Sequence, residues 1–233
     1  MPKLNLKKYL FLSLFIAGFS HSTFAQSGNL PYADGKFIHF GFSLGMNTMS
    51  FGVTPSHDSI NNSIYNANVS VLKPGFSVGV ISDIRLFRYL NLRFTPNLNF
   101  GDRQINYTNN GNSTTDSLNI TSVFFCLPVY LKYSAERKDN YRPYLIWGGG
   151  AYFDLARNKL NPVILKPLDF YTEFGVGCDI YFSFFKLAPE LKFAIGFNNM
   201  LTPYSGTDAD RIKLTNSLSK LTSRVLTLSF NFE

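Results

Sequence analysis

The chain has 233 residues, of which 16% are aromatic and 16% are charged, and its formal net charge is +7. Mean hydropathy is −0.01, and no apolar stretch beyond the N-terminal residues is long enough for a transmembrane helix. No dense basic stripe accompanies the positive charge, so we expect no nucleic-acid partner. High aromatic content with weak mean hydropathy is typical of a membrane barrel, in which half of each strand is polar.

The first 25 residues have the features of an export signal. Lys3, Lys7 and Lys8 precede a short apolar run, and residues 23–25 fit a small-residue cleavage site. We expect a signal peptide at 1–25, a periplasmic N-terminal segment at 26–36 and a barrel domain at 37–233. Cleavage removes three lysines, which leaves 208 residues and lowers the formal charge from +7 to +4. A membrane anchor is the alternative, but the apolar run is short for a bilayer.

Residues 91–100 alternate between apolar and polar side chains, which is the period of a strand with one apolar face. Leu92, Phe94 and Leu98 share one side, and Arg93 and Asn99 share the other. The pattern recurs, and it predicts eight strands at residues 37–52, 73–87, 91–100, 120–134, 142–156, 168–182, 186–198 and 223–233. Only a closed barrel places a sheet in lipid without bare edges. The sequence therefore predicts an all-β, eight-stranded antiparallel barrel in the bacterial outer membrane.

The connections between the predicted strands alternate in length. The long ones, 53–72, 101–119, 157–167 and 199–222, are rich in turn-forming residues, and we expect them to be outer loops. The short ones, 88–90, 135–141 and 183–185, are expected periplasmic turns, which places both termini in the periplasm. Residues 148–150, all glycine, are expected to break or kink their strand. A short helix is expected at 211–221.

The polar faces of the predicted strands carry charged side chains. A lysine or arginine facing lipid at mid-depth costs roughly 2–4 kcal/mol, so these residues should face inward and form ion pairs. The predicted lumen network comprises Arg93, Lys132, Glu173, Asp179, Lys186, Glu190 and Lys192. A structural role is favoured over a proton or substrate path. Eight strands enclose just enough space for side chains, so we predict no diffusion pore.

Two segments match the G-x-S-x-G pattern of hydrolases, around Ser43 and Ser77. A nucleophile elbow needs a strand-to-helix turn, and no predicted helix follows either match. His39 is the only candidate base for these serines. No Cys/His cluster has metal-ligand spacing, so we predict no catalytic residue, metal or cofactor. Cys126 and Cys178 alternate with opposite faces of their strands, which predicts two free thiols.

Five segments resemble the PorT family. They read FIHFGFSLGMNTMSFGV, KPGFSVGVISDIRLFRYLNLRFTPNLNFGDR, NYRPYLIWGGGAYFDLA, LAPELKFAIGFNNML and LTSRVLTLSFNFE. Together they include most of the predicted strands, whereas the predicted loops 53–72 and 101–119 contribute little.

The resemblance implies an outer-membrane component of the type IX secretion system of Bacteroidota. That system exports proteins with a C-terminal targeting domain, including proteases and gliding adhesins. Combined with a filled lumen, this implies a non-enzymatic accessory or assembly factor rather than the conduit. The implied partners are a translocon barrel or periplasmic subunits of that system, and outer-membrane lipid. Three alternatives remain: a small surface barrel that binds host, lipid or envelope ligands through its loops, a lipid enzyme using His39, and a soluble barrel or sandwich.

Overall fold

The computed structural model describes residues 29–55, 65–68, 73–109, 112–156, 164–202 and 218–233, so the expected signal peptide lies outside the described residues. A short 3-10 helix, η1 (Ala33–Gly35), precedes the strands. The strands are β1 (Ile38–Pro55), β2 (Tyr65–Asn68), β3 (Lys73–Arg85), β4 (Leu90–Phe94), β5 (Asn97–Asn109), β6 (Asn112–Ser134), β7 (Tyr141–Asp154), β8 (Ile164–Leu165), β9 (Leu168–Tyr181), β10 (Lys186–Gly196), β11 (Leu201–Thr202) and β12 (Leu218–Phe232). None of the described residues belongs to a helix long and apolar enough to cross a membrane.

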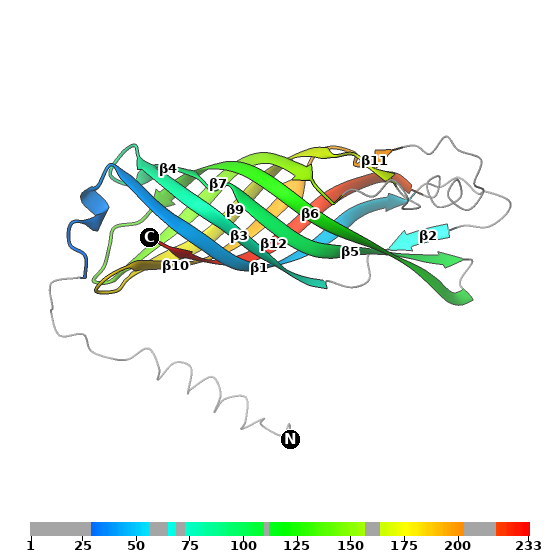
Figure 1. Ribbon diagram of the computed structural model, residues 1–233, viewed down its shortest axis with the longest axis horizontal. Coiled ribbons are helices and arrows are strands. Elements are labelled where there is room, and N and C mark those ends of the chain that lie inside the picture. The colour runs from blue at the N-terminus through cyan, green and yellow to red at the C-terminus, as the bar shows by residue number, and fades with distance from the viewer. Residues whose placement is uncertain (1–28, 56–64, 69–72, 110–111, 157–163, 203–217) are drawn as a thin grey trace, which may run out of the picture.

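The main sheet closes on itself. β1 pairs antiparallel with β12 on one side and with β3 on the other. The ring then runs β1, β12, β10, β9, β7, β6, the pair β4 and β5, and β3. These eight positions confirm the predicted eight-stranded antiparallel barrel, whose tilted strands are seen in Figure 1. Closure gives each ring strand a neighbour on both sides, which leaves no sheet edge to be satisfied by lipid.

Side chains along the ring strands alternate between the outside and the inside, as predicted. On β1 the outward side chains of Phe42 and Met46 are 50% and 61% exposed, whereas Ser43 and Asn47 are buried inside. Phe42 also stacks on Phe232 of the neighbouring β12, with ring centroids 4.9 Å apart. The outer wall is therefore apolar and suited to lipid, and the interior is largely polar.

One end of the barrel carries the short connections. Residues 86–89, 135–140 and 182–185 join successive strands there. Figure 1 shows η1 and the C-terminus at this same end, which we call the short-turn end. Barrels of this class place short turns in the periplasm and longer loops outside the cell. The short-turn end therefore corresponds to the periplasmic end predicted from the sequence.

The prediction of a loop at 101–119 is wrong. β5 and β6 continue through it, pairing from Asn97 opposite Cys126 to Asn109 opposite Asn112. This hairpin reaches past the barrel wall, and β2 pairs with β5 there (Figure 1). Its polar composition suggested a loop, but threonine also favours strands, and a ribbon in water needs no apolar face.

Three smaller predictions are corrected. The strand predicted at 91–100 is divided at Thr95 and Pro96, because proline has no N–H for the ladder. The backbone N–H groups of Thr95 and Val80 donate to Pro128 and Pro96, which keeps the ring closed at this point.

The glycines at 148–150 do not break β7, which pairs continuously on both sides. A Cβ on Gly148 would lie 2.1 Å from the carbonyl oxygen of Val129, so glycine permits a close approach between strands. In the helix predicted at 211–221, residues 218–221 instead begin β12, and 211–217 lie outside the described residues.

Candidate functional site

All seven predicted lumen residues lie inside the barrel, with exposed fractions between 1% and 7%. β4 positions Arg93, β6 positions Lys132, and β9 positions two acidic residues, Glu173 and Asp179. β10 contributes three inward residues, Lys186, Glu190 and Lys192, with Ala188 as the inward residue between the first two. The seven side chains come from four strands, and alternation alone brings them to the same side of the wall.

Arg93 is the centre of the network. Its guanidinium contacts Asp83 at 2.8 Å, Glu233 at 2.8 Å and Glu190 at 3.2 Å. The Arg93 side chain is 1% exposed, and those of Asp83 and Glu233 are 1% and 2% exposed. A buried guanidinium with three carboxylates has its charge and most of its donors satisfied, and it ties β4 to β3, β10 and the end of the chain.

Two lysines extend the network. Lys132 contacts Asp179 at 2.8 Å, and its ammonium lies 4.0 Å from the centre of the Tyr144 ring. Lys186 contacts the second oxygen of Glu233 at 2.6 Å. These bonds connect β6, β9 and β10 across the interior. Glu233 thus lies between two cations, Arg93 and Lys186.

A second part of the network lies further along β9 and β10. Lys192 contacts Glu190 at 3.1 Å, and Tyr144 donates its hydroxyl hydrogen to Glu190 at 2.7 Å. The hydroxyl of Tyr130 donates to Glu173. Tyrosine hydroxyls thus add donors to these buried carboxylates, which reduces the cost of burying their charge.

A separate buried cation, Arg103 on β5, lies outside the predicted set. It donates to the Ser122 hydroxyl at 2.9 Å and 2.6 Å and contacts Asp154 at 3.4 Å. Its guanidinium also lies over the rings of Phe51 and Phe124, 4.2 Å and 4.8 Å from their centres. Arg103 was missed because the sequence placed it in a loop.

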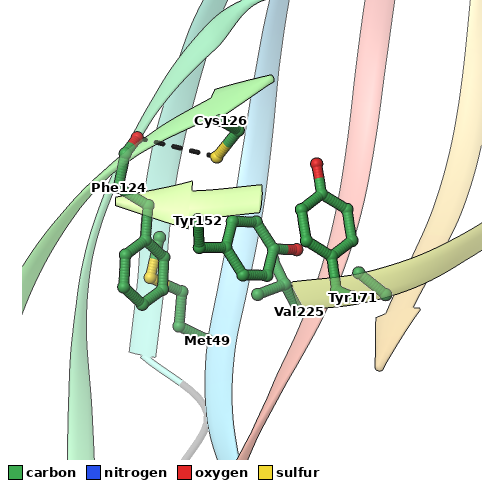
Figure 2. Packing of buried hydrophobic residues seen from close by; sticks show 7 residues of the cluster. Met49, Phe124, Cys126, Tyr152, Tyr171 and Val225 are labelled. Carbon is green, nitrogen blue, oxygen red and sulfur yellow. Dashed lines mark hydrogen bonds between the residues drawn. The ribbon is translucent and has the colours of Figure 1, made fainter. Parts of the chain in front are cut away.

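Aromatic side chains close the interior between the two charged regions. Phe124 stacks on Tyr152 with centroids 5.0 Å apart, and Tyr152 stacks on Tyr171 at 3.7 Å (Figure 2). Met49 and Cys126 pack in the same cluster. An adjacent internal cavity, lined by Ser43, Glu173 and Lys192 among others, measures about 20 Å³, enough for about one water molecule. The described interior therefore has no passage for a polypeptide.

The hydrolase-like segments do not assemble a catalytic site. Ser43 and Ser77 are buried inward residues of β1 and β3, and the Ser43 hydroxyl donates to Asn231 at 2.7 Å. His39 lies four residues from Ser43 on the same strand, a separation of about 13 Å at ~3.3 Å per residue. That is too far for the base to receive a proton from this serine.

Among the described residues, no group of three acidic, histidine or cysteine side chains is placed to hold a metal ion.

The N-terminal segment, residues 29–37, crosses the short-turn end. Arg137 donates to the carbonyl oxygens of Asn29 and Leu30, and its guanidinium lies 3.7 Å from the centre of the Tyr181 ring. The Asp34 carboxylate accepts from Tyr181, and it contacts Arg142 at 3.2 Å and Arg137 at 3.5 Å. This segment is therefore attached to the mouth of the barrel through backbone carbonyl oxygens and through the Asp34 carboxylate, which contacts three residues of the mouth.

The environment of Asp34 predicts a pH dependence for this attachment. Partial burial alone would raise its pKa, but the hydrogen bond from Tyr181 and the charges of Arg142 and Arg137 outweigh burial and lower the pKa. A lowered pKa means that the attachment is fully present above the unfolded value of about 4 and is lost only as pH falls through the lower folded value. Hydrogen exchange of residues 29–37 should therefore stay slow at neutral and mildly acidic pH.

Asp34→Asn should release the segment at neutral pH. We expect exchange there to accelerate roughly tenfold, the equivalent of one charge-assisted hydrogen bond, while the barrel strands stay protected. Asp139→Asn is the matched control, because Asp139 is exposed and only its backbone carbonyl meets Arg137. Equal exchange in both variants would contradict the role of the Asp34 carboxylate.

Two other residues of the network were not predicted. Asp83 is an inward residue of β3, as Ser77 is. The inward residue just before Asp83 is the apolar Ile81, and this obscured the alternation of polar and apolar side chains. Glu233 is the second residue outside the predicted lumen set. Its alternation with Asn231 and Ser229, both buried, was the available signal.

A closed antiparallel barrel with an apolar outer wall and a polar, filled interior defines the class: a β-barrel of the bacterial outer membrane. The chain belongs to the outer membrane protein beta-barrel domain family, whose model matches residues 24–202. The matched region ends at β11, so β12, which closes the ring, follows it.

Three solved outer-membrane barrels are similar to this chain. Neisserial surface protein A (NspA) is 11% identical, covers 84% of this chain and 98% of its own, and has a TM-score of 0.40. Ail of Yersinia pestis, solved with the heparin analogue sucrose octasulfate, is 7% identical, with coverages of 83% and 96% and a TM-score of 0.39. OprG of Pseudomonas aeruginosa is 11% identical, with coverages of 83% and 92% and a TM-score of 0.40. No curated protein matches the sequence.

Proposed function

We propose that this barrel is a non-enzymatic accessory or assembly component of the type IX secretion system. Two lines of support come together. The sequence segments that resemble the PorT family coincide with β1, β3 to β5, β7, β10 and β12. The barrel interior is filled by ion pairs and stacked tyrosines, with a cavity of about 20 Å³ beside them.

The filled interior is the observation that carries the accessory role. Even an α-helix needs a channel about 10–12 Å wide, whereas the cavity beside the aromatic stack holds about one water molecule. A secreted polypeptide would thus pass elsewhere, through a larger translocon barrel. Contacts to that barrel or to periplasmic subunits would come from the lipid-facing wall, the outer loops or the short-turn end.

Deletion of the gene tests this function directly. Cargo proteins with the C-terminal targeting domain should accumulate in the periplasm and disappear from the medium, and gliding should stop in a motile species. A complementing copy must restore both. Normal secretion in the deletion strain would contradict the proposed role.

A second candidate function is supported by the long hairpin. β5 and β6 extend beyond the barrel wall and are joined there by β2, which presents a sheet outside the membrane (Figure 1). A small surface barrel would use such a sheet to bind host, lipid or envelope ligands. The two functions differ in partners. Co-purification with a translocon barrel favours secretion, and isolation as a monomer with normal secretion favours surface binding.

A further inference from the structure

The mouth at the short-turn end contains an arginine-lined pocket of about 240 Å³. It is lined by four arginines, one tyrosine and two carboxylates, namely Arg85, Arg88, Arg137, Arg142, Tyr89, Asp34 and Glu136. Four guanidinium groups against two carboxylates leave two positive charges in excess. None of these seven residues belongs to the predicted lumen network.

The four arginines divide into two pairs by their bonds. Arg137 and Arg142 are occupied: they hold residues 29–34 and, in the case of Arg142, also the carbonyl oxygens of Ala135 and Arg88. Arg85 donates one hydrogen bond, to the carbonyl oxygen of Asp34 at 2.7 Å. Arg88 forms an ion pair with Glu136 at 2.9 Å, and the two side chains are 69% and 74% exposed. An exposed pair of this kind is weak and exchanges partners easily.

The orientation of the pocket indicates what reaches it. Arg85 follows Asp83 on the inward face of β3, and Arg142 precedes Tyr144 on the inward face of β7. The pocket therefore opens through the barrel mouth, away from the lipid-facing wall. This favours a ligand from the aqueous periplasm over a phospholipid headgroup.

The chain's own N-terminal segment shows the binding chemistry of this mouth. Arginines and Tyr181 already hold a turn and the short helix η1 by backbone carbonyl oxygens and by one carboxylate, Asp34. Arg85 and Arg88 line the pocket together with Asp34 of that segment. Guanidinium groups bind carboxylates by paired hydrogen bonds, and a concave positive site also increases the rate of encounter with an acidic partner.

We propose that this pocket binds an acidic peptide segment of a periplasmic protein, with Arg85 and Arg88 receiving its carboxylates beside the N-terminal segment. The site is independent of the secretion role: it predicts binding by the isolated barrel, whatever the barrel's place in export. When the peptide binds, its carboxylate replaces Glu136 as the partner of Arg88. The solvent-exposed ion pair between Arg88 and Glu136 is thereby exchanged for an ion pair between Arg88 and the peptide inside the pocket.

The test uses the protein purified from outer membranes into an uncharged detergent, with fluorescence anisotropy as the readout. The probe is a labelled peptide of alternating glutamate and glycine, and the matched probe has glutamine in place of glutamate. We expect saturable binding of the acidic probe only, weakened as salt rises from about 0.05 M to about 0.5 M. Arg88→Gln, which makes no bond to the N-terminal segment, should weaken it by about tenfold, the loss of one charge-assisted bond.

Arg85→Gln with Arg88→Gln should abolish binding. The control with the same charge change is Lys220→Gln with Arg224→Gln, two exposed positions on β12, and it should leave binding unchanged. The proposal fails if the glutamine probe binds equally, or if both double variants lose binding equally. Inorganic phosphate and an unlabelled acidic peptide are also compared as competitors. If phosphate displaces the probe at as low a concentration as the peptide does, the pocket is a simple anion site and the proposal fails. Arginine-dependent enrichment of anionic lipid in nanodiscs without peptide binding would likewise overturn it.

Discussion

Arg93→Met should destabilise the barrel by about 3–5 kcal/mol, the usual cost of removing one partner of a buried ion pair. The substitution leaves Asp83, Glu190 and Glu233 facing one another without the cation that now lies 2.8–3.2 Å from each. Methionine retains much of the volume, so the loss reflects charge more than a cavity. Trp147 is the single tryptophan and is 63% exposed on the outer wall, so its fluorescence reports transfer out of lipid during denaturant unfolding.

Two further variants isolate the electrostatic cause. Arg224→Met removes an exposed arginine from β12 and should change stability by no more than about 0.5 kcal/mol. Adding Asp83→Asn and Glu233→Gln to Arg93→Met should recover part of the loss, because neutral groups are less costly to bury than unpaired carboxylates. An Arg93→Met protein as stable as the Arg224→Met control would show that the network contributes no stability.

Alternation sufficed to predict most of the fold. A two-residue period assigns each side chain to one face, and the cost of a charge in lipid then determines which face is inside. Arg93 and Glu190 were located in this way without any knowledge of their partners. The same argument failed over most of 101–119, because the part of the β5–β6 hairpin beyond the barrel wall has no buried face and so no reason to alternate.

The pairing inside the barrel was beyond prediction because it depends on closure. Arg93 and Glu233 are 140 positions apart in sequence, and they meet only because β12 returns to pair with β1, which itself pairs with β3. The stagger between neighbouring strands determines which inward residues lie at the same level along the barrel axis. A single sequence contains little information about this stagger. The attachment of Asp34 to Arg137 and Arg142 has the same character, since a short segment before the barrel is held by a distant turn and by the first residues of β7.

Tyr152→Ala should cost about 3–5 kcal/mol, as expected for deleting a large buried aromatic side chain. Tyr152 lies between Phe124 and Tyr171 in the stack that fills the interior (Figure 2). Removing its ring leaves a cavity, and both neighbouring rings lose their stacking contact. Tyr152→Phe keeps the ring and is the matched control, with an expected loss below about 1.5 kcal/mol. Unfolding followed through Trp147 gives both values.

The functional consequence of the same variant separates an accessory barrel from a conduit. Arg93, Lys132 and the residues around them still close the interior toward the short-turn end, so Tyr152→Ala should show no steady conductance in planar bilayers. If the barrel assists secretion without carrying cargo, export per folded barrel in the outer membrane should equal that of the parent protein, although fewer barrels accumulate. A change in export per folded barrel, with Tyr152→Phe normal, would place cargo inside the barrel and contradict the accessory role. The comparison must be normalised to heat-modifiable, folded protein, because a stability loss of this size lowers abundance by itself.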